Sequence, residues 1–233
     1  MGSVRIGILG ASGDIGKETS KVLRGRGHET IECYRTKEGE EGKQEQQSRQ
    51  TAYISTKTLE ELTTSLEILF TESKIECVVN AMGIGRSTLS SGNMPVPTEQ
   101  LTTGEWEEII YVNLKIPILV TDMAIKHGVK RVIHVGSALT SYGLHGTAMA
   151  QAYSASKKAL YEYCYWRNKE IGEDAGVACI APGLVKTKMT EGSGLSSLFK
   201  GELEAYAVAE WILDVVEQET IVNSVQLPMK AGN

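Results

Sequence analysis

Hydrophobic and polar positions along the chain follow two alternating patterns. Short apolar runs of strand length occur near residues 4–9, 29–34, 51–54, 76–80, 129–135, 177–181 and 223–227. Apolar residues recur at helical spacing between these runs, near residues 14–25, 58–72, 102–126, 152–171 and 205–218. Strands that alternate regularly with helices favour a parallel sheet covered by helices on both faces. The pattern therefore predicts an α/β fold with a doubly wound parallel sheet, formed by residues 1–233 as a single domain.

Composition narrows the range of functions. The chain has 233 residues, of which 41% are hydrophobic and 23% are charged, as in ordinary globular proteins. Its formal net charge of −5 argues against general binding to nucleic acids or to membrane surfaces. The four cysteines are scattered, which favours free thiols over disulfides or metal ligands, so we expect no metal site. Because no apolar stretch reaches membrane-spanning length and no leader pattern is visible, we expect a cytoplasmic protein.

The first apolar run leads directly into a glycine-rich turn. Residues 10–16 read GASGDIG, and a helical pattern begins at Asp14. Glycines allow a tight turn and a close approach of the backbone to a diphosphate, while the start of a helix offers free N–H groups and the positive end of its dipole. The alternative is an ordinary strand-to-helix turn. At the end of the first strand of an α/β chain, we interpret the turn as a dinucleotide-binding site.

Tyr153 and Lys157 stand four residues apart in a helical pattern. Residues at this spacing share one face of a helix. An ammonium beside a phenol stabilises the phenolate, so it lowers the pKa of the tyrosine towards the working pH. A tyrosine tuned in this way exchanges a proton with a carbonyl or an alcohol oxygen. Alone the pair is weak support for catalysis, because most such pairs only cover a helix face.

Four further motifs accompany the glycine-rich turn and the Tyr–Lys pair. Residues 80–83 read NAMG after the fourth strand, Asn113 lies in the following helix, Ser137 follows the fifth strand, and residues 182–183 read PG after the sixth. In this order and spacing the motifs resemble the short-chain dehydrogenase/reductase family over nearly the whole chain. The resemblance implies a Rossmann-type fold and an NAD(P)-dependent enzyme that interconverts a carbonyl and an alcohol by hydride transfer.

The resemblance implies roles for four residues at the reacting centre. Tyr153 is the expected acid/base. Ser137 would hydrogen-bond the substrate oxygen and help to stabilise the charge that develops there. Lys157 would bind the hydroxyls of the nicotinamide ribose and depress the pKa of Tyr153, and Asn113 would anchor a water molecule of the proton relay.

The same resemblance implies a set of cofactor-binding residues. The glycine-rich turn would hold the diphosphate, and residues 80–83 would shape the adenosine and ribose side of the cleft. Residues 182–183 would form the wall of the site beside the nicotinamide. The expected cofactor-binding residues are Gly10, Ser12, Gly13, Asp14, Ile15, Gly16, Tyr34, Arg35, Asn80, Ala81, Gly83, Tyr153, Lys157, Pro182, Gly183 and Thr187.

The end of the second strand bears on the choice between NAD(H) and NADP(H). An acidic residue there accepts hydrogen bonds from the ribose 2′-hydroxyl and repels a 2′-phosphate. Tyr34 stands where NAD-dependent members of the family usually carry Asp, and Arg35 and Lys37 offer positive charge for a phosphate. The alternative is that Arg35 is an ordinary surface charge. We predict NADP(H) as the cofactor in preference to NAD(H).

The chain departs from the family pattern at several points. Asp14 stands where the main branch of the family has a glycine. The Asn-Asn-Ala-Gly motif of the family appears at residues 80–83 as NAMG, so one asparagine is missing and Met82 precedes the glycine. Tyr153 follows Ser137 by sixteen residues, a few more than usual, which places His145 in a loop beside the site. We expect His145 to be solvated rather than in contact with substrate.

Two other functions remain open from the sequence. A sugar-nucleotide epimerase or dehydratase would suit the spacing of the glycine-rich turn, although 233 residues leave little room for the substrate domain of those enzymes. A non-catalytic, NADP-sensing binding protein would normally lack the tyrosine, the lysine or the serine. All three residues are present here.

The remaining expectations concern substrate and assembly. We expect a small carbonyl or alcohol substrate and a substrate lid around residues 184–206, with Gly192 and Gly194 as hinges. Tyr161 and Tyr165 share one face of their predicted helix. Core packing is the simplest explanation for these tyrosines, and a self-association surface is the alternative; we expect a homodimer or homotetramer.

Overall fold

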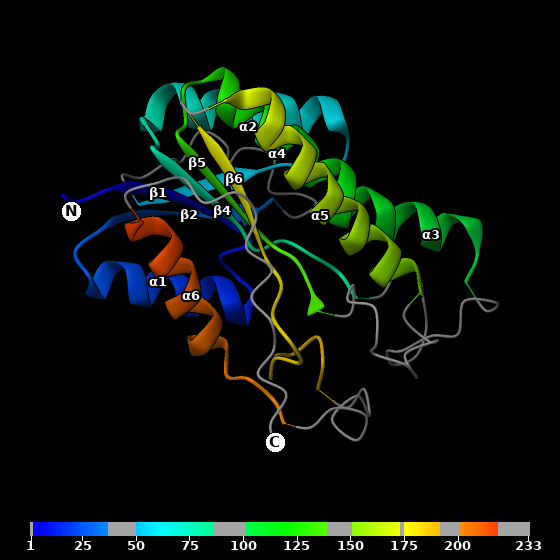
Figure 1. The fold of residues 1–233 in the computed structure, drawn as a ribbon. Coiled ribbons are helices and arrows are strands. Elements are labelled where there is room, and N and C mark those ends of the chain that lie inside the picture. Colours follow the sequence, from blue (N-terminus) through cyan, green and yellow to red (C-terminus); the bar gives the residue numbers. More distant parts are fainter. Residues whose placement is uncertain are drawn as a thin grey trace.

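The part of the chain that the structure describes folds into six parallel strands between two layers of helices. The computed structural model describes residues 2–36, 50–85, 101–138, 151–172, 175–191 and 201–218 (Figure 1). Within these ranges the strands lie in the order β3-β2-β1-β4-β5-β6. The direction of the order changes between β1 and β4, the point at which ligands bind in doubly wound sheets. This topology confirms the predicted α/β fold. The strands are β1 (Arg5–Leu9), β2 (Glu29–Arg35), β3 (Thr51–Ile54), β4 (Cys77–Asn80), β5 (Arg131–Val135) and β6 (Gly176–Ile180).

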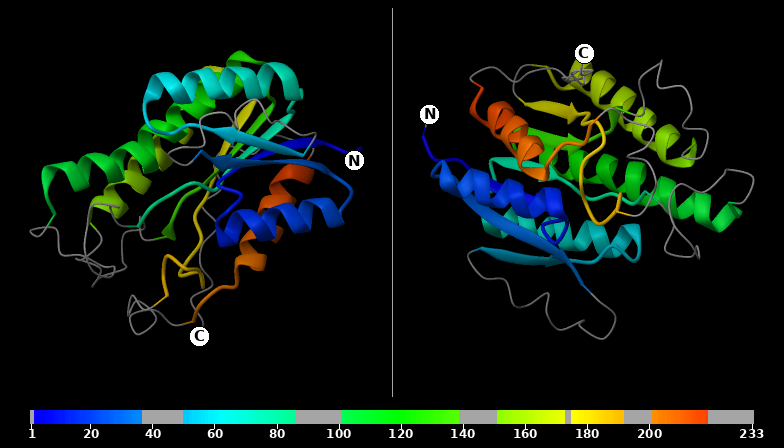
Figure 2. Two further views of the ribbon diagram at one scale, coloured as in Figure 1. Left: turned by 180° about the vertical axis from the view of Figure 1, so that it is seen from behind. Right: turned by 90° about the horizontal axis from the view of Figure 1, so that it is seen from below.

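Helices cover both faces of the sheet (Figure 2). α1 (Asp14–Gly25) and α6 (Ala205–Glu217) pack against each other on one face. The stretch predicted as one helix near 102–126 is continuous, but it contains a wider π-helical turn, η3, and it begins with a capping box between Thr102 and Glu105. The helices of the second face are α2 (Leu59–Ser73), α3 (Thr103–Ile110), η3 (Tyr111–Lys115), α4 (Ile116–Lys126) and α5 (Gln151–Ile171).

Two apolar layers join the helices to the sheet, because the central strands are buried on both faces. In β4, Val78 packs into the layer beneath α2, α4 and α5, while Cys77 and Val79 face α1 and α6. In β6, Val177 and Ile180 divide between the two layers in the same way. Strands of this kind read as continuous apolar runs, which is why short apolar segments predicted their positions.

Several sequence predictions lie outside the described residues. These are the strand near 223–227, the loop that contains His145, and the hinges Gly192 and Gly194. In the part of the chain that the structure describes, no helix combines the length and the apolar character needed to span a membrane.

Candidate active site

The glycine-rich turn brings the end of β1, the start of α1 and the turn after β4 into close contact. Gly10 has a φ of +81°, and a Cβ atom there would lie 2.8 Å from the backbone nitrogen of Met82. A Cβ atom on Gly16 would collide with the carbonyl oxygen of Gly10. Gly13 is the N-cap of α1 and provides no side-chain cap. The start of α1 therefore presents N–H groups without a helical acceptor, an arrangement that fits the diphosphate of a dinucleotide.

An open cavity of about 230 Å³ lies at the carboxyl-terminal ends of β1, β4, β5 and β6. Most of the predicted site residues surround it, whereas Gly10, Tyr34, Arg35, Asn80 and Asn113 do not line it. The predicted residues that line it are Ser12, Gly13, Asp14, Ile15, Gly16, Ala81, Gly83, Ser137, Tyr153, Lys157, Pro182, Gly183 and Thr187.

Tyr153 and Ser137 meet at this cavity through a side-chain hydrogen bond. Ser137 follows β5 and is buried, and Tyr153 lies in the first turn of α5. Burial raises the pKa of Tyr153, and the hydrogen bond with Ser137 acts against that rise. The shift is opposite to the one expected from the spacing of Tyr153 and Lys157, so that expectation is wrong.

The position of the Lys157 ammonium group explains the difference. Lys157 Nζ donates to the carbonyl oxygen of Val135 at 2.8 Å and lies 5.8 Å from the centre of the Tyr153 ring. The residue is only 3% exposed, and burial lowers the pKa of Lys157 to about 8. The cation is therefore bound to the backbone of β5 rather than to the phenol oxygen.

Asn113 supports the wall of the cavity from the π-helical turn η3. Its Nδ2 group donates to the carbonyl oxygen of Ile84 at 2.8 Å, and its Oδ1 atom accepts from the backbone nitrogen of Ile84 at 2.9 Å. A Cβ atom on Gly83 would lie 3.2 Å from Lys157 Nζ and 3.3 Å from Asn113 Oδ1. The small size of Gly83 thus allows the lysine and the asparagine to approach one segment from two helices.

A buried histidine that the sequence analysis overlooked fixes the turn after β4. Met82 donates its backbone N–H to Asn80 Oδ1 at 3.1 Å, so the Nδ2 group of Asn80 faces His134 Nδ1 at 3.2 Å. His134 Nδ1 must then accept, which leaves the proton on Nε2. Thr121 Oγ1 accepts that proton at 2.7 Å and donates its own to the carbonyl oxygen of Pro117 at 3.0 Å. Burial lowers the pKa of His134 to about 3, so the ring is neutral.

Further residues line the cavity although the sequence analysis did not select them. Most of them are immediate neighbours of predicted residues, so their position in the sequence could have indicated them. His134 could have been found as well, because it is a polar residue within an apolar strand. Apolar side chains predominate among these additional residues. Within the described ranges, no group of His, Cys, Asp and Glu has the arrangement of a metal site. The additional lining residues are Met82, Val135, Gly136, Ala138, Leu184, Val185, Lys188, Met189 and Thr190.

The predicted residues at the end of β2 lie apart from this cavity. The Tyr34 hydroxyl donates to Glu32, and this hydrogen bond raises the pKa of Tyr34 to about 12. Glu32 also forms an ion pair with Arg24 at 3.1 Å. Arg35 ends the strand with an exposed side chain, and Lys37 lies outside the described residues.

The sheet order and the glycine-rich turn at its switch point define a doubly wound α/β protein of the dinucleotide-binding type. A family model of short chain dehydrogenases matches residues 5–196. The chain therefore belongs to the short chain dehydrogenase family, and the resemblance of its motifs is confirmed.

Curated relatives are similar to parts of the chain. The 3-oxoacyl-(acyl-carrier-protein) reductase FabG of Thermotoga maritima is 28% identical over 123 residues, which cover 51% of this chain and 46% of the relative. The chain thus spans about half the length of that relative. Carbonyl reductase family member 4 of Danio rerio is 26% identical over 193 residues, which cover 79% of this chain and 77% of the relative.

Solved structures share the fold over nearly the whole chain. A short chain dehydrogenase from Burkholderia cenocepacia in complex with NADP has a TM-score of 0.76 at 20% identity, covering 96% of this chain and 95% of that structure. The aldohexose dehydrogenase of Thermoplasma acidophilum has a TM-score of 0.75 at 18% identity, covering 96% and 92%. At these identities the similarity describes the architecture of the chain.

Proposed function

We propose that the protein is an NADP(H)-dependent oxidoreductase that interconverts a carbonyl and an alcohol. The observation that supports this most strongly is the hydrogen bond between Ser137 and Tyr153, whose hydroxyl groups meet at the cavity beside the glycine-rich turn. The names of the relatives, a 3-oxoacyl reductase and a carbonyl reductase, agree with this chemistry.

The chain offers separate groups for each part of a dinucleotide. The N–H groups at the start of α1 would hold the diphosphate. Lys157 would bind the hydroxyls of the nicotinamide ribose. Pro182, Gly183 and Thr187 would lie beside the nicotinamide ring, since these residues line the same cavity as Lys157. When bound there, the nicotinamide supplies or accepts a hydride.

Tyr153 would supply the proton in the reductive direction. Its hydroxyl gives a proton to the substrate oxygen as the carbonyl carbon gains the hydride, which yields the alcohol. A raised pKa keeps this phenol protonated at neutral pH, as a proton donor requires. Ser137 would donate a hydrogen bond to the same oxygen. Lys157 and Asn113, which approach each other at Gly83, are the groups that we propose for replacing the proton.

Arg35 is the residue that we propose for a 2′-phosphate. It is exposed at the end of β2, where Tyr34 contributes no carboxylate. Glu32 is close by, but its charge is paired with Arg24. Similar solved structures include complexes with NADPH and NADP. Steady-state kinetics should therefore show a higher kcat/KM with NADPH than with NADH, and a preference for NADH would contradict this assignment.

Removal of the Tyr153 hydroxyl tests the proposed chemistry. In a panel of ketones, quinones and acyl substrates, Tyr153→Phe should reduce kcat by about 100-fold or more, because general acid catalysis is lost. Its Kd for NADPH should stay close to that of the wild type. Tyr165→Phe, on the exposed face of the same helix, is the matched control and should keep full turnover.

Two outcomes of the same screen would favour other functions. Tight binding of NADPH by the wild type without turnover of any carbonyl would favour the NADP-sensing protein. Conversion of a sugar nucleotide without net consumption of NADPH would favour the epimerase or dehydratase. A Tyr153→Phe variant with more than about one tenth of wild-type turnover would refute the role of this residue as the acid.

A further inference from the structure

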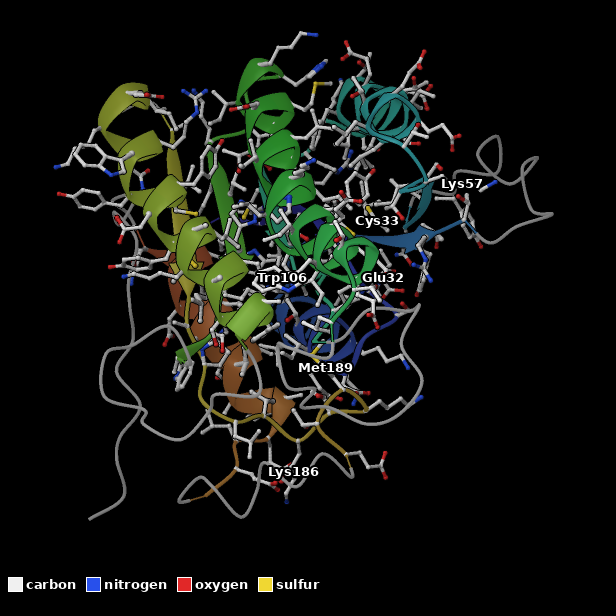
Figure 3. All side chains as sticks on the ribbon, turned by 90° about the vertical axis from the view of Figure 1, so that its right-hand side faces the viewer. Glu32, Cys33, Lys57, Trp106, Lys186 and Met189 are labelled. Atoms are coloured by element: carbon white, nitrogen blue, oxygen red, sulfur yellow. The ribbon has the colours of Figure 1, made fainter. Side chains whose placement is uncertain are left out.

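A hydrogen bond joins two segments that line the cavity. Asp14, the first residue of α1, accepts at Oδ2 from the backbone N–H of Lys188 at 2.8 Å. The two residues are 174 positions apart in the sequence, and both line the cavity. The segment that carries Lys188 can be followed in Figure 3, where Lys186 and Met189 are labelled. The bond therefore joins the glycine-rich turn to the segment after β6.

The turn around Lys188 is held in shape by its own hydrogen bonds. Thr190 Oγ1 accepts from the backbone N–H of Thr187 at 3.1 Å and donates to the carbonyl oxygen of Val185 at 2.7 Å. The backbone N–H groups of Thr190 and Glu191 both donate to the carbonyl oxygen of Thr187, at 3.0 and 2.9 Å. The N–H group of Lys188, in contrast, points out of this turn to Asp14. Asp14 thus anchors a preformed turn.

The charge of Asp14 conflicts with a diphosphate at the same helix start. The partner that the structure gives its carboxylate, among the described residues, is a neutral N–H group, so no ion pair cancels the charge. A diphosphate held by the first turn of α1 would lie close to this carboxylate, and the two anions would repel each other. In the main branch of the family this position is a glycine, which has neither the charge nor the hydrogen bond.

We propose that Asp14 has two effects: its carboxylate lowers the affinity of this protein for its dinucleotide by repelling the diphosphate, and its hydrogen bond to Lys188 holds the turn at residues 187–191 against the start of α1. The inference rests on the proposed function, since it concerns the cofactor of that function. Removal of one unit charge beside a diphosphate at a solvent-exposed site should change the affinity by about fivefold at low salt, and salt screens the effect.

Three variants separate the charge from the hydrogen bond. Asp14→Asn removes the charge and keeps an oxygen acceptor for the Lys188 N–H, while Asp14→Ala removes both. Glu72→Gln, at an exposed position near the end of α2, makes the same change in net charge on the opposite face of the sheet. Glu72→Gln is therefore the matched control for non-specific charge effects.

The first measurement is the Kd of NADPH by fluorescence titration at about 20 mM and about 500 mM salt. We expect Asp14→Asn to bind NADPH about fivefold more tightly than the wild type at low salt, with most of the gain lost at high salt. Asp14→Ala should bind at least as tightly as Asp14→Asn, and Glu72→Gln should match the wild type.

The second measurement needs no cofactor. Hydrogen–deuterium exchange of the Lys188 amide should be slow in the wild type and in Asp14→Asn, and faster in Asp14→Ala. Equal exchange in the wild type and in Asp14→Ala would overturn the inference, because the hydrogen bond from the Lys188 N–H to Asp14 would then not stabilise the turn at residues 187–191.

The outcomes distinguish this inference from the proposed function. If Asp14→Asn binds NADPH no more tightly than the wild type at low salt, the inference fails while the proposed function stands. If the wild type and every variant bind neither NADPH nor NADH, the proposed function fails and the inference fails with it.

Discussion

Replacing Lys157 by methionine should make the protein more stable at neutral pH while it removes activity. Lys157 is 3% exposed, and burial lowers its pKa to about 8 from the ordinary 10.5. One pKa unit corresponds to about 1.4 kcal/mol, so the buried charge costs the folded state about 3 kcal/mol at pH values below both pKa values. Methionine has a similar length and carries no charge.

One lost contact offsets part of this gain. Lys157 Nζ donates to the carbonyl oxygen of Val135 at 2.8 Å, and methionine leaves that buried acceptor without its donor. Such a loss costs about 1–2 kcal/mol. We therefore expect Lys157→Met to raise the free energy of unfolding by about 1–2 kcal/mol at neutral pH, measured by urea denaturation. Turnover should fall by about 100-fold or more, because the proposed proton path loses its cation.

The pH dependence separates the charge from packing. Between about pH 8 and the ordinary pKa of 10.5, Lys157 binds fewer protons in the folded state than in the unfolded state. The stability of the wild type therefore rises with pH in this window, and the advantage of Lys157→Met shrinks.

The adjacent lysine provides the control. Lys158→Met removes a partly exposed ion pair with Glu162 and should change stability by less than about 0.5 kcal/mol at either pH. A Lys157→Met protein that is less stable than the wild type at neutral pH would refute the reasoning. An advantage that stays constant up to about pH 10 would do the same, since it would not arise from the charge.

Three further changes test other parts of the molecule. Thr121→Val removes the acceptor of the His134 Nε2–H group, so it should lower the free energy of unfolding, measured by urea denaturation, by about 1–3 kcal/mol. An unchanged value would contradict the assignment of the His134 proton to Nε2. Arg35→Ala should raise the KM for NADPH by about tenfold and leave the KM for NADH nearly unchanged in steady-state kinetics. Trp166 is 63% exposed and contacts the ring of Tyr165, one of the two tyrosines considered for self-association, so Trp166→Glu should convert an oligomer to a monomer in light scattering. A monomeric wild type would contradict self-association through these side chains.

Much of the fold was predictable because burial leaves a strong pattern in the sequence. Every residue of β4 is buried, and the strand is apolar up to Asn80, so its position and length followed from the sequence. The π-helical turn η3 was not predictable, since one widened turn hardly disturbs the helical spacing of apolar residues around it.

The candidate site was predictable where it depends on the ends of strands. Ser137 and the glycine-rich turn come together because parallel strands end at one edge of the sheet. Hydrogen bonds between distant segments leave no pattern in the sequence. The bond between Asp14 and Lys188, which are 174 positions apart, could therefore not be predicted. The direction of a side chain was equally hidden, since Tyr34 stands at the end of β2 but its hydroxyl turns back to Glu32.

A polar side chain near the end of α5 holds this helix against the sheet. Asn168 Nδ2 donates to the carbonyl oxygen of Val177 at 2.6 Å, and Asn168 Oδ1 accepts from the Val177 N–H at 2.8 Å, as a neighbouring strand would. The amide therefore satisfies both backbone groups of Val177 in β6 and fixes the position of α5 along this strand. A rigid helix carries this position over about 22 Å to Tyr153. The amide that holds α5 against β6 therefore also helps to set where Tyr153 meets Ser137.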